Sequence, residues 1–241
     1  MIIVKNLRKR FKDFEAVKGI SFEAKEGEVL GLLGENGAGK TTTLRILATM
    51  LKPTDGDAQI NGYDLLKEPE KVRAEIGILF GGEVGIYDRL TARENIRYFA
   101  ELNNMKKSDI EKRIDELSNM LDMNEYIDKR VAKFSRGMKQ KVSIARAIVH
   151  DPKVMLFDEP TSGLDVTATR VVHDFIQTCR AEGKVIIFSS HTMSEVEKLC
   201  DRVVIINKGE IVANGTIPEL EKHFNNDNLE EVFMRLVGGA Q

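Results

Sequence analysis

A chain of 241 residues with 42% hydrophobic and 31% charged residues has the composition of a globular protein with one sizeable core. Its formal net charge of −2 supplies no general attraction for nucleic acid, so nucleic acid is not expected as a partner. Its longest apolar runs, such as residues 203–206, have strand length and fall short of the roughly 18 residues that a membrane span needs.

The cysteines and the amino terminus predict a cytosolic protein. Cys179 and Cys200 are far apart in the sequence, lack the spacing of metal ligands and lie on segments with a helical pattern. We therefore expect both to be reduced thiols of the core. Residues 1–5 lack the layout of a signal peptide, which also favours the cytosol.

The first third of the chain has the pattern of strands and turns. Strands are predicted over residues 2–5, 19–24, 29–33, 58–60 and 76–80. A helix is predicted over residues 40–51, directly after a glycine-rich segment, and Pro53 is expected to end it.

The middle of the chain, from about residue 90 to residue 150, has a helical pattern. Thr91 and Ser108 are each followed three residues later by a glutamate, so both fit capping boxes. One helix face carries Ile110, Ile114, Leu117 and Leu121. That face is interpreted as ordinary core, and the segment as a helical insertion between two groups of strands.

Strands and helices alternate again in the last third. Strands are predicted over residues 154–158, 185–190 and 203–207, and a last helix over residues 229–237. Thr192, three residues before Glu195, is expected to cap another helix. Buried apolar strands that alternate with helices indicate an α/β fold with a mostly parallel sheet.

Residues 34–42, with the sequence GENGAGKTT, predict a phosphate-binding loop. The pattern G-x-x-x-x-G-K-[ST] lets backbone N–H groups surround phosphate oxygens at the start of a helix. Lys40 is expected to reach the β- and γ-phosphates, Thr41 to bind Mg²⁺, and Thr42 to donate near the α-phosphate. The predicted binding residues are Gly34, Glu35, Asn36, Gly37, Ala38, Gly39, Lys40, Thr41 and Thr42. A chance glycine turn is disfavoured because a strand precedes the loop and a helix follows it.

Two more predicted strands end in or are followed by residues that could take part in nucleotide hydrolysis. Asp158 closes a predicted apolar strand and is expected to hold Mg²⁺, while Glu159 is expected to polarise a water for attack on the γ-phosphate. The alternative, a pair of exposed acids, is disfavoured by the four apolar residues before them. His191 also follows a predicted strand, where ligands gather in parallel sheets, although a lone histidine is more often structural.

The stretch FSRGMKQKVSIARA, residues 134–147, resembles the signature region of ATP-binding-cassette (ABC) ATPases. The phosphate loop, helical insertion, signature, Asp158-Glu159 pair, residues 162–165 and His191 occur in the order of that family, over nearly the whole chain. The resemblance implies a P-loop NTPase core with an N-terminal antiparallel β subdomain and a helical signature subdomain. It implies one ABC ATPase domain over residues 1–222, with the helical subdomain inserted at about 88–150, and a C-terminal extension over residues 223–241.

The resemblance also implies a mechanism in which two cassettes enclose two ATP molecules head to tail. Ser135 and Gly137, at the start of a helix, would face the ATP held by the other subunit, which is expected to be an identical chain. Glu159 would be the general base and His191 the sensor of the γ-phosphate. Asp165 would communicate across the dimer.

An aromatic residue near the amino terminus would complete the nucleotide site. Phe11 resembles the residue that stacks on adenine in this family, with Val17 beside it. The alternative is that Phe11 is a core aromatic of an edge strand.

The chain departs from the family pattern in three motifs: the signature, the adenine-stacking residue and the glutamine loop. Arg136 and Met138 replace a glycine and a glutamine of the signature, and Phe11 stands where tyrosine is commoner. Residues 81–83, with the sequence GGE, follow a predicted strand where the family usually has a glutamine that touches Mg²⁺. Glu83 could substitute as an oxygen ligand, or the contact could be absent.

The chain carries one cassette without a membrane span, which is typical of a separate ATPase subunit. It is expected at the cytoplasmic face of the membrane, docked on an integral-membrane transporter subunit through residues 83–89 and the helical insertion. Val84, Ile86 and Tyr87 would form the apolar part of that surface, or would instead pack inside the helical subdomain. The run YDRLTAREN, the signature and the tail LEEVF resemble bacterial exporter cassettes, in particular the subunit of sodium-extrusion transporters.

Other functions stay open. Export of drugs or lipids is an alternative, because no residue here reports the substrate. A soluble ABC ATPase acting in translation or DNA repair is disfavoured, because the chain lacks paired cassettes, a long coiled coil and a basic stripe. A cassette that only binds ATP is disfavoured by the presence of Lys40, Asp158, Glu159 and His191, but the altered signature and the missing glutamine keep this alternative open.

Overall fold

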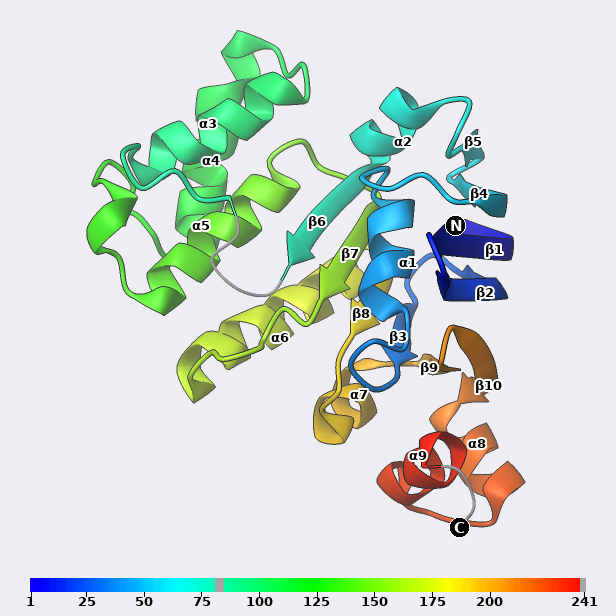
Figure 1. Ribbon diagram of the computed structural model, residues 1–241. Helices are drawn as coiled ribbons and strands as arrows, with labels where there is room; N and C mark the ends of the chain where they lie inside the picture. Colours follow the sequence, from blue (N-terminus) through cyan, green and yellow to red (C-terminus); the bar gives the residue numbers. More distant parts are fainter. Residues whose placement is uncertain (81–84, 239–241) are drawn as a thin grey trace.

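The computed structural model describes residues 1–80 and 85–238 and contains two sheets (Figure 1). The first is antiparallel, in the order β2-β1-β4-β5. Its strands are β1 (Ile2–Phe11), β2 (Phe14–Ala24), β4 (Asp55–Ile60) and β5 (Tyr63–Asp64). The first two are longer than predicted and pair as a hairpin from Ile2 opposite Ala24 to Phe11 opposite Phe14. Exposed charged residues on the outer half of the hairpin conceal its strand pattern in the sequence.

The second sheet has the order β10-β9-β3-β8-β7-β6. Its strands are β3 (Val29–Leu33), β6 (Ile76–Phe80), β7 (Val154–Asp158), β8 (Val185–Ser189), β9 (Arg202–Asn207) and β10 (Glu210–Thr216). All neighbours pair in parallel except β10, which is antiparallel to β9. The predicted α/β class with a mostly parallel sheet and an antiparallel β subdomain is confirmed. The carboxyl ends of β3, β8 and β7 therefore lie side by side at the same end of the sheet.

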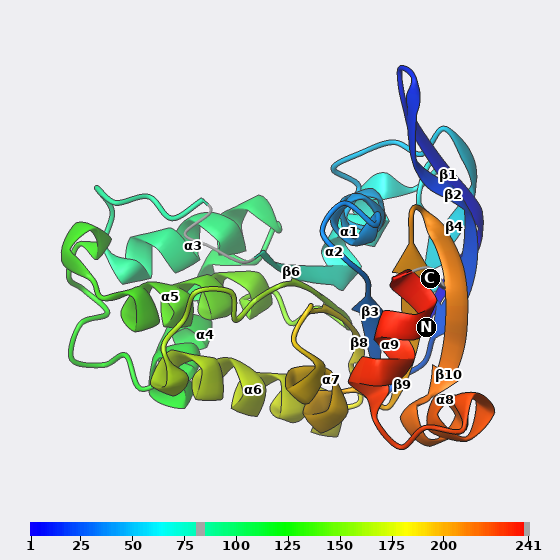
Figure 2. The same cartoon turned by 60° about the horizontal axis from the view of Figure 1, so that its bottom comes forward.

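Both faces of this sheet are covered, so successive residues of its strands enter different cores. In β7, Val154 and Leu156 join the core toward the antiparallel sheet, whereas Met155 and Phe157 join the core toward the other helices. The first core includes α1 (Lys40–Leu47) and α2 (Pro69–Glu75). Figure 2 shows α1 between the two sheets, with α6 (Val166–Ala181) and α7 (Met193–Leu199) on the opposite side. Burial on both faces explains the continuous apolar runs of the strands.

The helical insertion contains α3 (Ala92–Leu102), α4 (Lys107–Met120), the short 3-10 helix η1 (Val131–Lys133) and α5 (Arg136–Ile148). The capping box at Thr91 is confirmed: its hydroxyl accepts from the Glu94 N–H, and the Glu94 carboxylate accepts from the Thr91 N–H. The prediction of a capping box at Ser108 is wrong, because α4 has already begun at Lys107. The apolar face around Ile114 is buried in the core, as predicted.

One helix end differs from prediction, and one helix near the carboxyl terminus was not predicted. Helix α1 ends at Leu47, four residues before the predicted end, because Thr49 adopts a left-handed conformation with φ 58°. The last helix, α9 (Leu229–Val237), has the predicted bounds. Before it lies α8 (Ile217–Phe224), which is not among the predicted helices and which crosses the expected boundary between residues 222 and 223.

No helix in residues 1–80 and 85–238 is long and apolar enough to cross a membrane. Neither cysteine takes part in a disulfide. Burial raises the pKa of Cys179 to about 12 and also raises that of Cys200. Both thiols are therefore protonated and inert at neutral pH, as expected of core cysteines.

Candidate active site

The loop between β3 and α1 lies so close to other backbone segments that two of its positions require glycine. A Cβ added to Gly34 would lie 2.3 Å from the Ile206 carbonyl oxygen, and one on Gly39 would lie 2.6 Å from the Ala16 carbonyl oxygen. Both distances are impossible for a real side chain next to backbone. The predicted residues 35–37 are exposed at the surface of the loop, and Ala38 is buried. The glycines thus let the loop fold tightly against β2 and β9.

Lys40, the first residue of α1, points its ammonium back into the loop. Its Nζ donates to the carbonyl oxygens of Gly34 at 2.6 Å and Glu35 at 3.2 Å, and lies 3.7 Å from Glu159 Oε1. The side chain is only 4% exposed, and burial lowers its pKa although Glu159 and Asp158 act in the opposite direction. An anionic group bound in the loop would act in the same direction as Glu159 and Asp158 and would favour the charged form of this lysine.

Thr41 and Asp158 meet beside that lysine. The Thr41 hydroxyl donates to Asp158 Oδ1 at 3.1 Å, and the Ser189 hydroxyl donates to the same oxygen at 2.7 Å. Asp158 is the last residue of β7 and is 8% exposed, so its carboxylate is held rigidly at the sheet edge. A carboxylate and a hydroxyl are the hard oxygen donors that suit Mg²⁺, so these two residues fit that ion.

Glu159 leaves β7 with a left-handed backbone (φ 47°), which turns its side chain toward the loop. Its N–H donates to the carbonyl oxygen of Ser189 at 3.1 Å and to the hydroxyl of the same serine at 3.1 Å. Its Oε2 lies 3.4 Å from Nδ1 of His191, which is 56% exposed. The carboxylate thus lies between Lys40 and His191, where a water beside a bound phosphate could be deprotonated.

The two residues expected at adenine lie in different surroundings. Phe11 is 44% exposed on the β1–β2 hairpin, which projects from the molecule in Figure 2, and Lys9 Nζ lies 5.1 Å from its ring centre. Val17 is fully buried, beneath Gly39. An exposed aromatic ring is accessible for stacking, whereas Val17 supports the loop from below.

The predicted signature residues begin α5, on the other side of β6 and β7 from α1 (Figure 1). The Ser135 hydroxyl accepts from the Met138 N–H at 3.3 Å, so the expected helix start is confirmed. Arg136 donates to the Ser162 carbonyl oxygen at 3.3 Å. Asp165 similarly caps α6, accepting from the Ala168 N–H at 2.8 Å. The structure does not bring the residues at the starts of α5 and α6 into contact with the phosphate-binding loop of their own chain.

The expected docking segment is described from residue 85 onward; Val84 and the departure at residues 81–83 lie outside the described residues. Ile86 packs against the helical core, whereas Tyr87 is 45% exposed and contacts Tyr98 edge-on at 5.3 Å. The buried Asn95 side chain accepts from the Tyr87 N–H and donates to the Tyr87 carbonyl. Arg146 of α5 donates to the Gly85 carbonyl. This segment is therefore attached to the helix that begins with the signature.

Sequence reasoning missed two polar residues beside the site. Ser189 lies directly opposite Asp158 in the β7–β8 register, which the sequence reveals only once the strand order is known. Gln140 of α5 is buried and donates to the Pro160 carbonyl oxygen at 3.3 Å, joining the signature helix to the loop after Glu159. Ser189 and Gln140 both make contacts between elements that are distant in sequence, which is why no local pattern reveals them.

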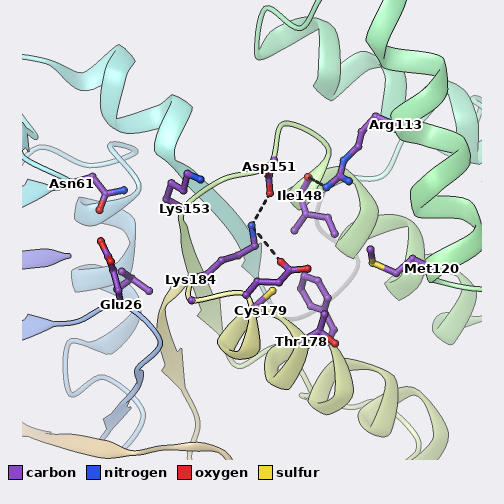
Figure 3. Close-up of a pocket in the computed structure, with 14 residues that line it drawn as sticks. Glu26, Asn61, Arg113, Met120, Ile148, Asp151, Lys153, Thr178, Cys179 and Lys184 are labelled. Atoms are coloured by element: carbon purple, nitrogen blue, oxygen red, sulfur yellow. Dashed lines mark hydrogen bonds and ion pairs between the residues drawn. The ribbon is translucent and has the colours of Figure 1, made fainter.

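A cavity of about 750 Å³ lies at the opposite, amino-terminal end of β7 and β8, between α4 and α6 (Figure 3). Its central cation, Lys184, is 9% exposed and donates to Asp151 at 2.7 Å and to the Pro152 carbonyl oxygen at 2.9 Å. Glu182 lies 3.6 Å from the same ammonium. The lysine is already neutralised by its neighbours, so its role here is to join the segments around β7 and β8.

The Lys184–Asp151 pair predicts a pH-dependent contribution to stability. The hydrogen bond from Lys184 holds the pKa of Asp151 below its ordinary value of 3.8. Because the folded pKa is lower than the unfolded one, the stabilisation is present above about pH 4 and is lost as pH falls through the folded pKa. Asp151→Asn should therefore lower the free energy of unfolding at pH 7, by at most about 1 kcal/mol because Asp151 is largely exposed.

Urea unfolding of both proteins at neutral and acidic pH checks this expectation. The difference between native and variant should shrink toward about pH 3. A difference that stays constant over that range would mean that the ion pair does not stabilise the fold.

Comparison with known proteins agrees with this arrangement. The profile of the ABC transporter family matches residues 17–162. The ABC transporter ATP-binding protein NatA of Bacillus subtilis is 46% identical, over 99% of both chains. The linearmycin resistance ATP-binding protein LnrL of the same species is 34% identical, over 95% of this chain and 73% of the relative.

Solved structures share the fold over almost the full length. The ATP-binding subunit of an ABC transporter superposes with a TM-score of 0.87 and 30% identity, covering 98% of this chain and 99% of the other. A dimeric bacterial ABC transporter cassette superposes with a TM-score of 0.80 and 26% identity, covering 90% and 98%. Taken with the phosphate loop and the carboxylates at the sheet edge, these matches show that the chain is a member of the ABC transporter family, as an ATP-binding subunit.

Proposed function

We propose that this chain hydrolyses ATP as one of two identical cassettes that drive export through a separate membrane subunit. The observation that carries the proposal is the position of Glu159 between Lys40 and His191, beside the Thr41–Asp158 pair. These side chains supply a phosphate-binding cation, oxygen donors for Mg²⁺ and a base, all at the carboxyl-terminal end of the parallel strands. Members of this family couple ATP hydrolysis to transport, and the intact set of residues supports the same reaction here.

In the proposed reaction, Glu159 takes a proton from water as the water oxygen bonds to the γ-phosphorus. The bond from that phosphorus to the β–γ bridging oxygen breaks, and ADP leaves with the electron pair. Lys40 stabilises the charge on the β- and γ-phosphates, and His191 orients the γ-phosphate and the water. Mg²⁺, held by Thr41 and Asp158, would neutralise further phosphate charge.

The nucleotide would be held by contacts beyond the phosphates. The backbone of residues 34–39 and the hydroxyl of Thr42 would donate to phosphate oxygens at the start of α1. Phe11 would stack on adenine, which its exposure on the hairpin supports. Val17 would shape the base of the loop from its buried position.

A second cassette would complete each site. Ser135 and Gly137 begin α5 away from their own loop, which supports a role at the γ-phosphate of a partner's ATP (Figure 1). Asp165 caps α6, whose first residue, Val166, is 87% exposed. An apolar side chain left so exposed beside a cap supports contact with a second subunit there. The dimeric cassette among the similar structures supports the same arrangement.

The membrane partner would dock on the segment that begins at Gly85, placing the chain on the cytoplasmic face of the membrane. Tyr87 and Tyr98 form an exposed aromatic pair there, and Arg146 connects the segment to the signature helix. Movement of the partner could thus reach α5 through a direct hydrogen bond.

Sodium ion is the proposed substrate of the complete transporter. The motifs that resemble sodium-extrusion cassettes and the full-length similarity to NatA support it. The similarity to LnrL, which is named for linearmycin resistance, makes drug export the second candidate.

Disruption of the gene in its native cells tests the substrate. Cells that lack the chain should accumulate sodium in high-salt medium, and the native chain should restore efflux whereas Glu159→Gln should not. Unchanged sodium efflux together with increased accumulation of an antibiotic would instead support the drug exporter.

A further inference from the structure

A buried carboxylate joins the two loops that carry Glu159 and His191. Glu195, on α7, is 9% exposed, and its Oε2 accepts from the hydroxyls of Thr161 at 3.0 Å and Ser190 at 2.9 Å. Thr161 lies two residues after Glu159, and Ser190 immediately precedes His191. One carboxylate oxygen therefore holds the loop after β7 and the loop after β8 together.

The same network fixes the turn that presents His191. The Ser190 hydroxyl, besides donating to Glu195, accepts from the Thr192 N–H at 3.0 Å. Thr192 immediately precedes α7, but its side chain makes no capping hydrogen bond, contrary to the sequence prediction. The predicted partner of that cap, Glu195, is instead turned into the protein. Both neighbours of His191 in the chain are thus held by this network.

A histidine on α6 orients the carboxylate. His173 is 7% exposed, and its Nε2 lies 3.0 Å from Glu195 Oε1. Its other nitrogen, Nδ1, lies 3.5 Å from the Lys198 ammonium, which can only donate. Nδ1 is therefore the acceptor and Nε2 carries the proton that is donated to Glu195. All three donors converge on a carboxylate that accepts from each of them.

We propose that Glu195 is a positioning residue for ATP hydrolysis, oriented by His173, and that it sets the approach of Glu159 and His191. The proposal rests on the proposed function, because it assigns the base and the γ-phosphate sensor to that pair. Glu159 and His191 approach to 3.4 Å from separate loops, and Glu195 bonds to both loops. A base displaced by about 1 Å can lose on the order of a hundredfold in rate while ATP still binds.

Four variants of the full chain test the proposal. His173→Phe keeps the ring but removes the donor, and His173→Gln returns an N–H donor at a similar reach. Glu195→Gln replaces one acceptor oxygen by an NH₂ donor, which cannot accept from the three donors that surround this side chain. Glu197→Gln, on the exposed face of the same helix, is the matched control. Steady-state phosphate release gives kcat and KM, and equilibrium titration gives the Kd for Mg-ATP.

We expect His173→Phe and Glu195→Gln to lower kcat by about tenfold to a hundredfold, with KM and Kd changed less than about twofold. His173→Gln should recover most of the rate, and Glu197→Gln should match the native chain. An unchanged kcat in both variants, or equal losses in His173→Phe and His173→Gln, would overturn the proposal. Ser190→Ala, which removes a single hydroxyl, replaces a variant that does not fold and should lower kcat in the same way.

Amide hydrogen exchange separates this proposal from the proposed function. Residues 159–164 and 189–192 should exchange faster in His173→Phe than in the native chain and the Glu197→Gln control, whether or not the isolated chain turns over ATP. Unchanged exchange in both segments would overturn the positioning role. A native chain that releases no phosphate even with its membrane subunit would count against the proposed function alone.

Discussion

Glu159→Gln is expected to lower the rate of phosphate release by roughly 10²–10⁴-fold while ATP binding stays intact. Glutamine has nearly the same shape but cannot accept a proton from water at neutral pH. The backbone turn at Glu159 is held by its own N–H to Ser189, so the side-chain change leaves the loop in place. Loss of rate without loss of affinity is the signature of a missing general base.

Glu197→Gln makes the same chemical change on the exposed face of α7 and should keep the native rate. Single-turnover phosphate release with radiolabelled ATP measures the chemical step, and a filter-binding titration measures the affinity. Native phosphate release in the Glu159→Gln protein would remove this residue from the role of base.

Lys40→Ala should weaken Mg-ATP binding by about a hundredfold, because charged hydrogen bonds contribute up to about 3 kcal/mol each. The β- and γ-phosphates would lose the cation that the loop surrounds. We expect the fold to persist, since burial already disfavours the charged form of this lysine in the native protein. The loss should therefore appear in nucleotide binding and not in thermal stability.

Lys112→Ala, on the exposed face of α4, controls for the removal of a positive charge. Isothermal titration with Mg-ATP and a thermal melt without nucleotide measure the two quantities on the same samples. Native affinity in Lys40→Ala would contradict the assignment of the loop.

Local chemistry explains why the site itself could be predicted from sequence. The constraints at Gly34 and Gly39 act within one short segment, so the loop is visible as a continuous pattern. Asp158 and Glu159 follow a strand whose burial on both faces leaves an unbroken apolar run. The order of motifs along the chain indicates the family without any knowledge of distances.

The capping predictions that were wrong concern side chains whose partners are set by contacts between distant segments. Thr91 and Ser108 have the same spacing to a glutamate, but only Thr91 is held extended, by a bridge to Arg130, so only it caps a helix. Glu195 fits the same local pattern after Thr192, yet its carboxylate bonds to Thr161 and His173, which lie on other elements. Capping patterns therefore identify helices more reliably than they identify the partners of their side chains.

Size-exclusion chromatography of the native chain and Glu159→Gln, with and without Mg-ATP, tests the ATP-driven dimer most directly when phosphate release is followed on the same samples. We expect Glu159→Gln to become a stable dimer only with Mg-ATP, the added Lys40→Ala change to return it to monomer, and the native chain to release phosphate. A Glu159→Gln chain that stays monomeric with saturating ATP, together with a native chain that releases no phosphate, would contradict the ATP-driven dimer.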